Sequence, residues 1–388
     1  MMRNATAAEA LENILGLLLW ALLFFAGSWT ATGQSLDDRV EGLLVGSLVG
    51  DAVGAPTEFA TPIRSPWTSP DSVLSPQGRK ALGALFQIGD TKRQPDPYGP
   101  WTQRPGALTD DSRFKIVFFD HLSREGRISG DGFAREILAW ERGDNDQFQR
   151  LRTEWLLEFR LPARWVLGDS ASGLPPERAW GGIATMAGQM PFLPIAALTS
   201  TPVDAYRLTW DVDFLDNGIG RDITAGLVAG LNAALAEGAD WTSVETAMRQ
   251  TDPWGFDRVP WVQRRMTRWL DVAAEIAREA RGQPAALFEL LESRLGAETW
   301  WEAWVPLVVV FATARMTEGD PLVTMQIILE FGHDTDSYLQ LAGAFFGALH
   351  GKQVFPLPLR TTVQERLGDE YGDSVDRWME LIHLYRDR

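Results

Sequence analysis

Residues 40–54, with the sequence VEGLLVGSLVGDAVG, decide the fold of this chain. Their glycines stand at positions 42, 46, 50 and 54. This four-residue spacing places them on one face of a predicted helix. Glycine inside a helix costs about 1 kcal/mol relative to alanine, so a whole stripe needs a compensating gain. The close approach of another backbone would supply that gain.

A second stripe of the same kind lies near the other end of the chain. Residues 341–351 read LAGAFFGALHG, with Gly343, Gly347 and Gly351 again four residues apart. We expect the two striped helices to pack closely against each other or against shared neighbours in the core. Ser35 is the predicted N-cap of the first of them.

The remainder of the chain is helical in its hydrophobic periodicity. Helices are predicted at 112–125, 130–142, 145–160, 201–213, 221–237, 241–250, 260–281, 285–294, 297–316, 320–331, 337–350 and 361–386. Residues 59–108 contain many prolines that break this pattern, and they are predicted to form a long loop. The aromatic residues Trp67, Tyr98 and Trp101 indicate that this loop is a partly ordered rim rather than a simple linker. Period-two alternation is absent. The sequence therefore predicts a single all-α domain over residues 34–388.

Composition excludes several classes of function. The net charge of −16, from 36 basic and 52 acidic residues, argues against a nucleic-acid backbone as a partner. The chain has no cysteine, which excludes disulfides, thiolate nucleophiles, zinc–cysteine sites and iron–sulfur clusters. Its four histidines are scattered. A metal site in this chain would therefore be built from carboxylates.

The N-terminus resembles a secretory signal. Residues Ile14 to Gly27 form an apolar run shorter than the ~20 residues that a membrane-spanning helix needs. Ala31-Thr32-Gly33 fits a small-x-small cleavage pattern. We expect residues 1–33 to be a signal peptide, which places the protein outside the cytoplasm, secreted or periplasmic, with no membrane insertion after cleavage. An uncleaved membrane anchor, or a start codon assigned too far upstream, is the alternative.

Two acidic runs carry the candidate chemistry. Residues 109–112 read TDDS and residues 334–337 read DTDS, and each run precedes an apolar helical stretch. Oxygen ligands of this kind suit hard cations such as Mg²⁺, Mn²⁺ or Ca²⁺. A site built from both runs would join Asp110 and Asp334, which lie 224 positions apart (334 minus 110).

Each run also has a simpler interpretation. Thr109 is a good N-cap, and carboxylates in a first helical turn complement the helix dipole. The same holds for Asp334 and Asp336. Asp51 is harder to explain in this way, because a negative charge is disfavoured near the C-terminal end of a helix. Glu58 follows seven residues later, with no basic neighbour before Arg64.

These segments together resemble a known family. Residues 50–58, GDAVGAPTE, resemble the Gly-Asp-Ala-x-Gly-x-x-x-Glu motif of the ADP-ribosylglycohydrolase family. Residues 109–112 resemble its Thr-Asp-Asp-Ser/Thr metal motif. Residues 332–337, GHDTDS, resemble its Gly-Gly-Asp-Thr-Asp-Ser/Thr metal motif, which the striped helix follows. All three occur in the family's order, and the resemblance spans roughly residues 39–352.

The resemblance implies an all-α fold with a cleft that holds two Mg²⁺ or similar ions. It also implies removal of ADP-ribose from modified side chains or small conjugates by cleavage at the anomeric carbon. The metal ligands carried over by position are Thr109, Asp110, Asp111, Asp334, Asp336 and Ser337. Glu58 would lie at the substrate mouth as a gate or an acid/base group. Because cleavage at an anomeric carbon needs proton transfer, we expect Glu58 or Asp110 to be the catalytic carboxylate.

The chain departs from the family pattern in two places. His333 replaces the second glycine of the C-terminal motif, and we expect it to face the substrate, with stacking behind the site as the alternative. The family's Gly-Asn-Gly-x-x-Met-Arg loop is WGGIATMAGQ at residues 180–189, without the asparagine and arginine. Gly181 and Gly182 could let backbone amides approach a phosphate. Residues 214–222 are an alternative contributor, or a simple turn between helices.

The leading hypothesis is a metal-dependent hydrolase of an ADP-ribose conjugate, either a small molecule or an ADP-ribosylated protein side chain. The altered loop at residues 180–189 favours a second hypothesis, a hydrolase of a nucleoside or another small N- or O-glycoside. A third hypothesis is a non-catalytic ADP-ribose-binding relative. It is disfavoured because every proposed ligand position keeps an oxygen donor.

Overall fold

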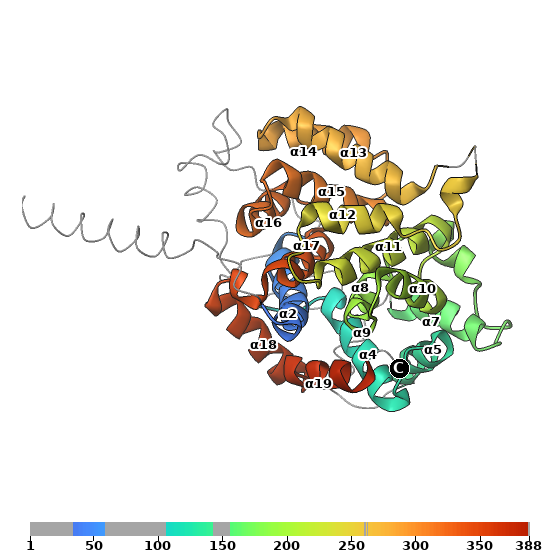
Figure 1. Ribbon diagram of the computed structural model, residues 1–388. Helices are drawn as coiled ribbons and strands as arrows, with labels where there is room; N and C mark the ends of the chain where they lie inside the picture. The colour runs from blue at the N-terminus through green and yellow to red at the C-terminus, as the bar shows by residue number, and fades with distance from the viewer. Residues whose placement is uncertain (1–33, 59–105, 143–155, 260, 262, 387–388) are drawn as a thin grey trace, which may run out of the picture. The chain divides into compact units, whose positions relative to one another are not determined.

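Helices α2 (Leu36–Gly54) and α17 (Thr335–His350) form the centre of the fold (Figure 1). The computed structural model describes residues 34–58, 106–142, 156–259, 261 and 263–386. A Cβ atom added to Gly46 would lie 2.1 Å from the carbonyl oxygen of Gly343, and one on Gly347 would lie 1.8 Å from that of Gly42. The two glycine stripes therefore face each other across a backbone-to-backbone contact. The predicted close packing of these helices is confirmed.

The start of α2 is capped as the sequence predicts. The Ser35 hydroxyl accepts a hydrogen bond from the Asp38 backbone N–H at 3.1 Å, and the Asp38 carboxylate accepts one from the Ser35 backbone N–H at 3.1 Å. This reciprocal arrangement satisfies two amides that the helix itself leaves unpaired.

Further helices surround this central pair. Their bounds are α4 (Asp110–Glu125), α5 (Gly130–Arg142), α7 (Leu156–Val166), α8 (Gln189–Phe192), α9 (Ile195–Leu198), α10 (Pro202–Val212), α11 (Gly218–Ala234), α12 (Trp241–Gln250), α13 (Arg265–Ala280), α14 (Pro284–Arg294), α15 (Trp304–Met316), α16 (Pro321–Phe331), α18 (Leu357–Tyr371) and α19 (Val375–Tyr385). Short 3₁₀ turns are η1 (Ala55–Thr57), η4 (Pro176–Gly182), η5 (Phe256–Arg258) and η6 (Lys352–Val354). Among the described residues the backbone forms no strand, only an isolated bridge between Thr185 and Glu302. The all-α prediction is confirmed.

Two of the predicted helices differ most from the observed ones, while the ends of several others are shifted by a few residues. The helix predicted at 297–316 begins only at Trp304, because residues 301–303 pair instead with residues 184–186: Met186 N–H donates to the Trp301 carbonyl at 3.1 Å, and Ala303 N–H to the Ala184 carbonyl at 2.9 Å. The helix predicted at 361–386 is two helices. Gly372, with φ of 65°, ends the first in the left-handed conformation that glycine tolerates.

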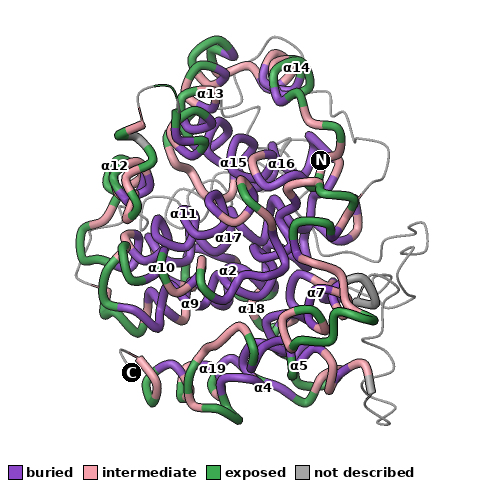
Figure 2. The backbone as a smooth tube through the Cα atoms, turned by 90° about the vertical axis from the view of Figure 1, so that its right-hand side faces the viewer, coloured by how far each residue is buried: buried purple, intermediate pink, exposed green. Residues whose placement is uncertain are grey.

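The buried residues concentrate in the middle of the compact unit Ser35–Arg388. Figure 2 shows α2, α11, α15 and α17 as almost continuously buried tubes, with exposed residues on the outer helices. α15 and α17 are apolar on nearly every face, as expected for helices surrounded by other helices. No helix within the described residues has the length and apolar character needed to cross a bilayer.

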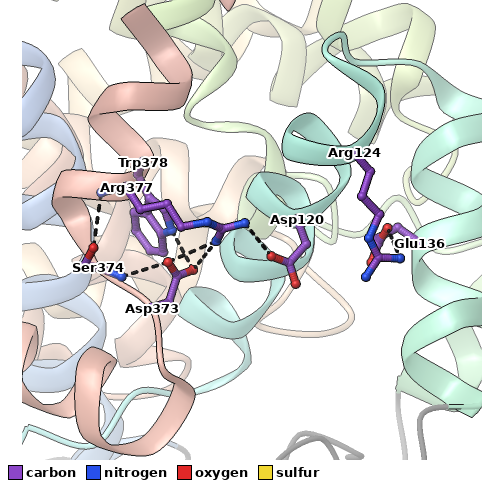
Figure 3. A network of polar contacts seen from close by, with 7 residues as sticks. All are labelled: Asp120, Arg124, Glu136, Asp373, Ser374, Arg377 and Trp378. Carbon is purple, nitrogen blue, oxygen red and sulfur yellow. Dashed lines mark hydrogen bonds and ion pairs between the residues drawn. The ribbon is translucent and has the colours of Figure 1, made fainter. Parts of the chain in front are cut away.

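Polar contacts hold α4 between its neighbours α19 and α5 (Figure 3). Arg377 of α19 donates to Asp120 of α4 at 2.7 Å and to Asp373 at 3.0 Å. On the other side, Arg124 of α4 lies 3.2 Å from Glu136 of α5. These ion pairs fix the helix whose first turn carries the first acidic run.

Three predictions concern residues that the structure does not describe. The signal peptide over residues 1–33 and most of the loop at 59–108, including Trp67, Tyr98 and Trp101, lie outside the described residues. Of the helix predicted at 145–160 only residues 156–160 are described, and they begin α7, which continues past the predicted end to Val166. Export and the partly ordered rim therefore stay predictions.

Candidate metal centre

Asp51 anchors the start of α4 to the end of α2. Its side chain is fully buried and accepts hydrogen bonds from the Thr109 backbone N–H at 3.1 Å, from the Thr109 hydroxyl at 2.7 Å and from the Ser112 hydroxyl. Burial raises the pKa of Asp51, and the Ser112 and Thr109 hydrogen bonds oppose that rise. Asp51 thus has the non-local role that its unfavourable place on a helix indicated.

The first acidic run is also a helix cap. The Thr109 hydroxyl accepts a hydrogen bond from the Asp111 backbone N–H at 3.3 Å, and Asp110 and Asp111 occupy the first turn of α4. The simpler interpretation therefore holds for Thr109 without excluding a site. The start of α4 also brings the carboxylates of Asp110 and Asp111 close to Asp336 at the start of α17.

The second acidic run follows two residues in unusual backbone conformations. Gly332 has φ of 85° and His333 has φ of 64°, so the chain turns sharply between α16 and α17. Asp334 stands at the N-cap position, yet its side chain makes no capping hydrogen bond. Helix capping therefore does not account for Asp334. Asp336 lies in the first turn and is buried.

The carboxylates of the two runs converge into two groups of three. Oxygen atoms of Asp110, Asp111 and Asp336 all lie within 4.8 Å of one another, and so do oxygen atoms of Glu58, Asp334 and Asp336. We call these groups the two triads. Asp336 belongs to both, so the triads share one carboxylate. The fold therefore brings together runs that are far apart in the sequence.

Burial, and then mutual repulsion, raises the pKa values of the aspartates in the triads. Burial, and then repulsion from Asp336, raises the pKa of Asp110 to about 8. Burial, and then the charge of Asp51, raises the pKa of Asp336 to about 6. The pKa values of Asp111 and Asp334 are raised well above their usual range for the same two reasons, burial and then Asp336. Such a set is stabilised in its charged form by a bound cation.

A buried lysine lies beneath this acidic site. Lys115 is one turn after Asp111 on α4, and its ammonium donates to the Asp111 carbonyl at 2.7 Å and to the Gln340 side-chain oxygen. Gln340 in turn donates its amide N–H to the Asp111 carboxylate. Burial lowers the pKa of Lys115 to about 8, against the attraction of Asp111. The two oxygen acceptors and the nearby carboxylates favour the charged form of the lysine.

A cavity of about 130 Å³ opens beside the triads. Its polar lining residues are Glu58, Asp110, Asp334 and Ser337. The rest of the lining, which we call the apolar wall, is mainly apolar and consists of Phe159, Trp180, Thr185, Met186, Ala187, Met190 and Trp301. Trp180 meets Phe159 edge-on, with ring centroids 5.4 Å apart. The cavity thus combines aromatic side chains with carboxylates in one lining.

Asp216 holds the apolar wall in place. Its buried carboxylate accepts from the Thr185 hydroxyl and from the Gly188 backbone N–H, both at 3.1 Å. Asn217 adds a hydrogen bond from its side-chain amide to the Ile183 carbonyl at 2.9 Å. Residues 214–222, the alternative contributor predicted from sequence, therefore support the wall from behind and are not among the residues that line the cavity.

The other predicted site residues lie as follows. Ser337 lines the cavity, and its hydroxyl donates to Asp111 at 3.0 Å. His333 stacks on Trp300 at a centroid distance of 3.6 Å and is not among the cavity-lining residues. Gly181 and Gly182 follow Trp180, are exposed and have positive φ, and they do not line the cavity either. Substrate binding by these three stays a prediction.

Several residues of the site were not predicted from the sequence. They are Lys115, Gln340 and most of the apolar wall. Lys115 stands in the otherwise apolar sequence FKIVFF, and Gln340 stands in the apolar start of the second glycine stripe. A polar residue one turn after a candidate ligand, in an apolar context, is the signal that could have found both.

The fold and the site define an all-helical protein whose clustered buried carboxylates could hold divalent cations. The model of the ADP-ribosylglycohydrolase family matches residues 32–388, and the chain belongs to this family. The resemblance drawn from its motifs is thereby confirmed. Among solved structures the chain is similar to one described as an "ADP-ribosylglycohydrolase-related protein complex", with a TM-score of 0.52 and 19% sequence identity. The similarity covers 90% of this chain and 98% of that chain and shows a shared fold. No curated protein matches the sequence.

Proposed function

We propose that the protein is a metal-dependent hydrolase that cleaves the glycosidic bond of an ADP-ribose conjugate at a centre for two Mg²⁺-type ions. The observation that carries this proposal is the pair of triads that share Asp336. Family membership supports a glycosyl hydrolase function, since the family acts on ADP-ribose conjugates.

The donor chemistry of the triads fits such ions. Every member is a carboxylate, and the hydroxyls of Thr109 and Ser337 lie alongside. Hard cations prefer oxygen donors, so Mg²⁺, Mn²⁺ and Ca²⁺ all suit this set. In our proposal one ion is held by Glu58, Asp334 and Asp336. The other is held by Asp110, Asp111 and Asp336.

Bound ions of this kind polarise oxygen atoms and orient a substrate. The carboxylates of Glu58 and Asp110 line the cavity, so either can exchange a proton with a substrate oxygen or nitrogen there. Positive charge that develops at the anomeric carbon would be stabilised by the same carboxylates. We assign the acid/base role to one of these two carboxylates, Glu58 or Asp110.

The apolar wall bears on the substrate class. Trp180, Phe159 and Trp301 offer flat surfaces that can pack against a base or another apolar group. No cationic side chain is among the described residues that line the cavity. This favours, as a second candidate, a nucleoside or small glycoside without a diphosphate.

The proposal can be tested by measuring the hydrolysis of ADP-ribosylated arginine or serine peptides, O-acetyl-ADP-ribose and free nucleosides in Mg²⁺ and in EDTA. We expect turnover of an ADP-ribosyl substrate in Mg²⁺ only. Asp336→Asn should lower it by more than about 100-fold, since even residues that only orient metal ligands are worth about 10- to 100-fold. Asp376→Asn, at an exposed position on α19, is the matched control and should keep the parental rate.

Three outcomes would contradict the proposal. Turnover of nucleosides alone would favour the second candidate. Metal-dependent binding of ADP-ribose without any turnover would indicate a non-catalytic relative. An Asp336→Asn protein that is as active as the parent would remove the metal centre from the mechanism.

A further inference from the structure

Three helices meet in a buried polar network directly behind the triads. The network contains Ser47 of α2, Lys115 and Asp111 of α4, and Gln340 of α17. Each of these side chains is at most 1% exposed. Burying an ammonium and an amide is costly unless both are well paired, so the network has to be explained.

The chemistry of the donors fixes how Gln340 is oriented. An ammonium group has only hydrogen-bond donors. Lys115 must therefore face the amide oxygen of Gln340, and the hydroxyl of Ser47 donates to the same oxygen at 3.4 Å. The amide N–H of Gln340 is left to face Asp111, whose carboxylate accepts it. Without the ammonium, only the Ser47 hydroxyl would hold the amide oxygen, and the amide N–H would be less firmly fixed against the carboxylate.

The oriented amide in turn fixes the Asp111 carboxylate. One oxygen of Asp111 accepts from Gln340, and the other accepts from the Ser337 hydroxyl at 3.0 Å. Both oxygens are thus held from different sides. A carboxylate oxygen has lone pairs for a hydrogen bond and for a cation together, so these bonds set its direction without blocking it.

We propose that Lys115 and Gln340 are a positioning pair for Asp111: the ammonium orients the amide, and the amide orients the carboxylate toward the metal. This inference rests on the proposed metal centre. Residues that orient a ligand typically contribute about 10- to 100-fold to metal affinity. The two residues should act as one unit on the Asp111 side chain, because Lys115 bonds directly only to the backbone carbonyl of Asp111 and reaches its carboxylate through Gln340.

The test is a double-mutant cycle on metal affinity, measured by isothermal titration of the full-length protein with MnCl₂ and with MgCl₂. Gln340→Met should weaken binding by about 10-fold or more in the parental protein. In a Lys115→Met background the same change should weaken binding by about threefold or less, because the amide oxygen has lost its hydrogen bond from the ammonium there and the amide holds the carboxylate less firmly. Comparing the effect of Gln340→Met in two backgrounds cancels the direct repulsion between the ammonium and the ion.

Controls separate positioning from folding. Gln326→Met replaces another buried glutamine, on the neighbouring α16, and should leave the affinity unchanged. Thermal unfolding in EDTA shows whether each variant is folded. If Gln340→Met is not folded, Gln340→Asn takes its place in the cycle, since its shorter side chain cannot reach both Lys115 and Asp111.

An equal effect of the Gln340 substitution in both backgrounds, or no effect in the parental protein, would overturn the positioning pair. A parental protein that binds neither Mn²⁺ nor Mg²⁺ would instead overturn the proposed metal centre. The two failures are therefore distinguishable.

Discussion

Replacing Gly46 by alanine tests the contact on which the fold depends. The added Cβ would lie 2.1 Å from the carbonyl oxygen of Gly343 and 2.9 Å from the ring of Phe355. Non-bonded contacts below 3.0 Å to a Cβ are essentially never seen. The nearest obstacle is backbone, so α2 and α17 would have to separate by about 1 Å, a gap that forfeits a quarter to a half of the dispersion energy of each contact it opens.

Two opposing terms set the size of the effect. Alanine is favoured over glycine in a helix interior by about 1 kcal/mol. Overpacking a well-packed core costs about 1–3 kcal/mol, and more where backbone has to move. Because the whole α2–α17 interface must open, we expect the overpacking cost to exceed the gain in helix propensity. The free energy of unfolding should fall by about 2 kcal/mol or more.

The assay is urea unfolding followed by circular dichroism, with Gly368→Ala as the control. Gly368 is also inside a helix, α18, but the nearest atom to its added Cβ would be the Asp373 carbonyl oxygen at an ordinary 3.9 Å. That variant should be more stable than the parent by up to about 1 kcal/mol. A Gly46→Ala protein that is as stable as the Gly368→Ala protein would refute the reasoning.

Two further predictions concern pH and the cavity wall. His121 is buried and accepts a hydrogen bond from the Ser129 backbone N–H, and burial lowers its pKa to about 4, against 6.5 for an ordinary histidine. Between pH 6.5 and 4 the unfolded chain therefore binds a proton at this residue that the folded chain does not, so stability falls on acidification by up to about 3 kcal/mol. His121→Gln should flatten the urea midpoint against pH in that range, and an unchanged slope would contradict this. Trp180→Ala should raise KM by about tenfold with a smaller change in kcat, since it removes one flat surface of the cavity. Trp254→Ala, at a half-exposed tryptophan that does not line the cavity, should leave KM unchanged, and equal effects of the two substitutions would contradict a role in binding.

Local signals explain what the sequence could predict. A glycine stripe is costly within its own helix, so it indicates a close partner even when the partner is hundreds of residues away. The two acidic runs could be matched in the same way, since each is rich in one kind of metal ligand. Helix ends were less predictable: Trp304 begins α15 only because residues 301–303 bond to residues 184–186, a contact that no local pattern encodes.

The positioning pair shows what local sequence signals cannot predict. Lys115 and Gln340 are 225 positions apart, and although each is a polar residue in an apolar stretch, neither indicates the other as its partner. Their meaning comes from their distance to Asp111, which only the folded chain sets. The apolar wall is similar, because it combines α7, η4, α8 and Trp301. Residues recruited from many elements to one cavity leave no shared spacing in the sequence.

The geometry of the triads depends on the packing of the glycine stripes. At the last glycine of the first stripe, a Cβ on Gly54 would lie 2.4 Å from the Asp336 Cα, and the Gly54 carbonyl accepts from the Thr335 hydroxyl at 2.9 Å. Less than one turn earlier, Asp51 holds Thr109 at the start of α4. Both acidic runs are thus positioned by the end of α2. Any change that widens the helix contact there must also move Asp336 away from its partners in both triads.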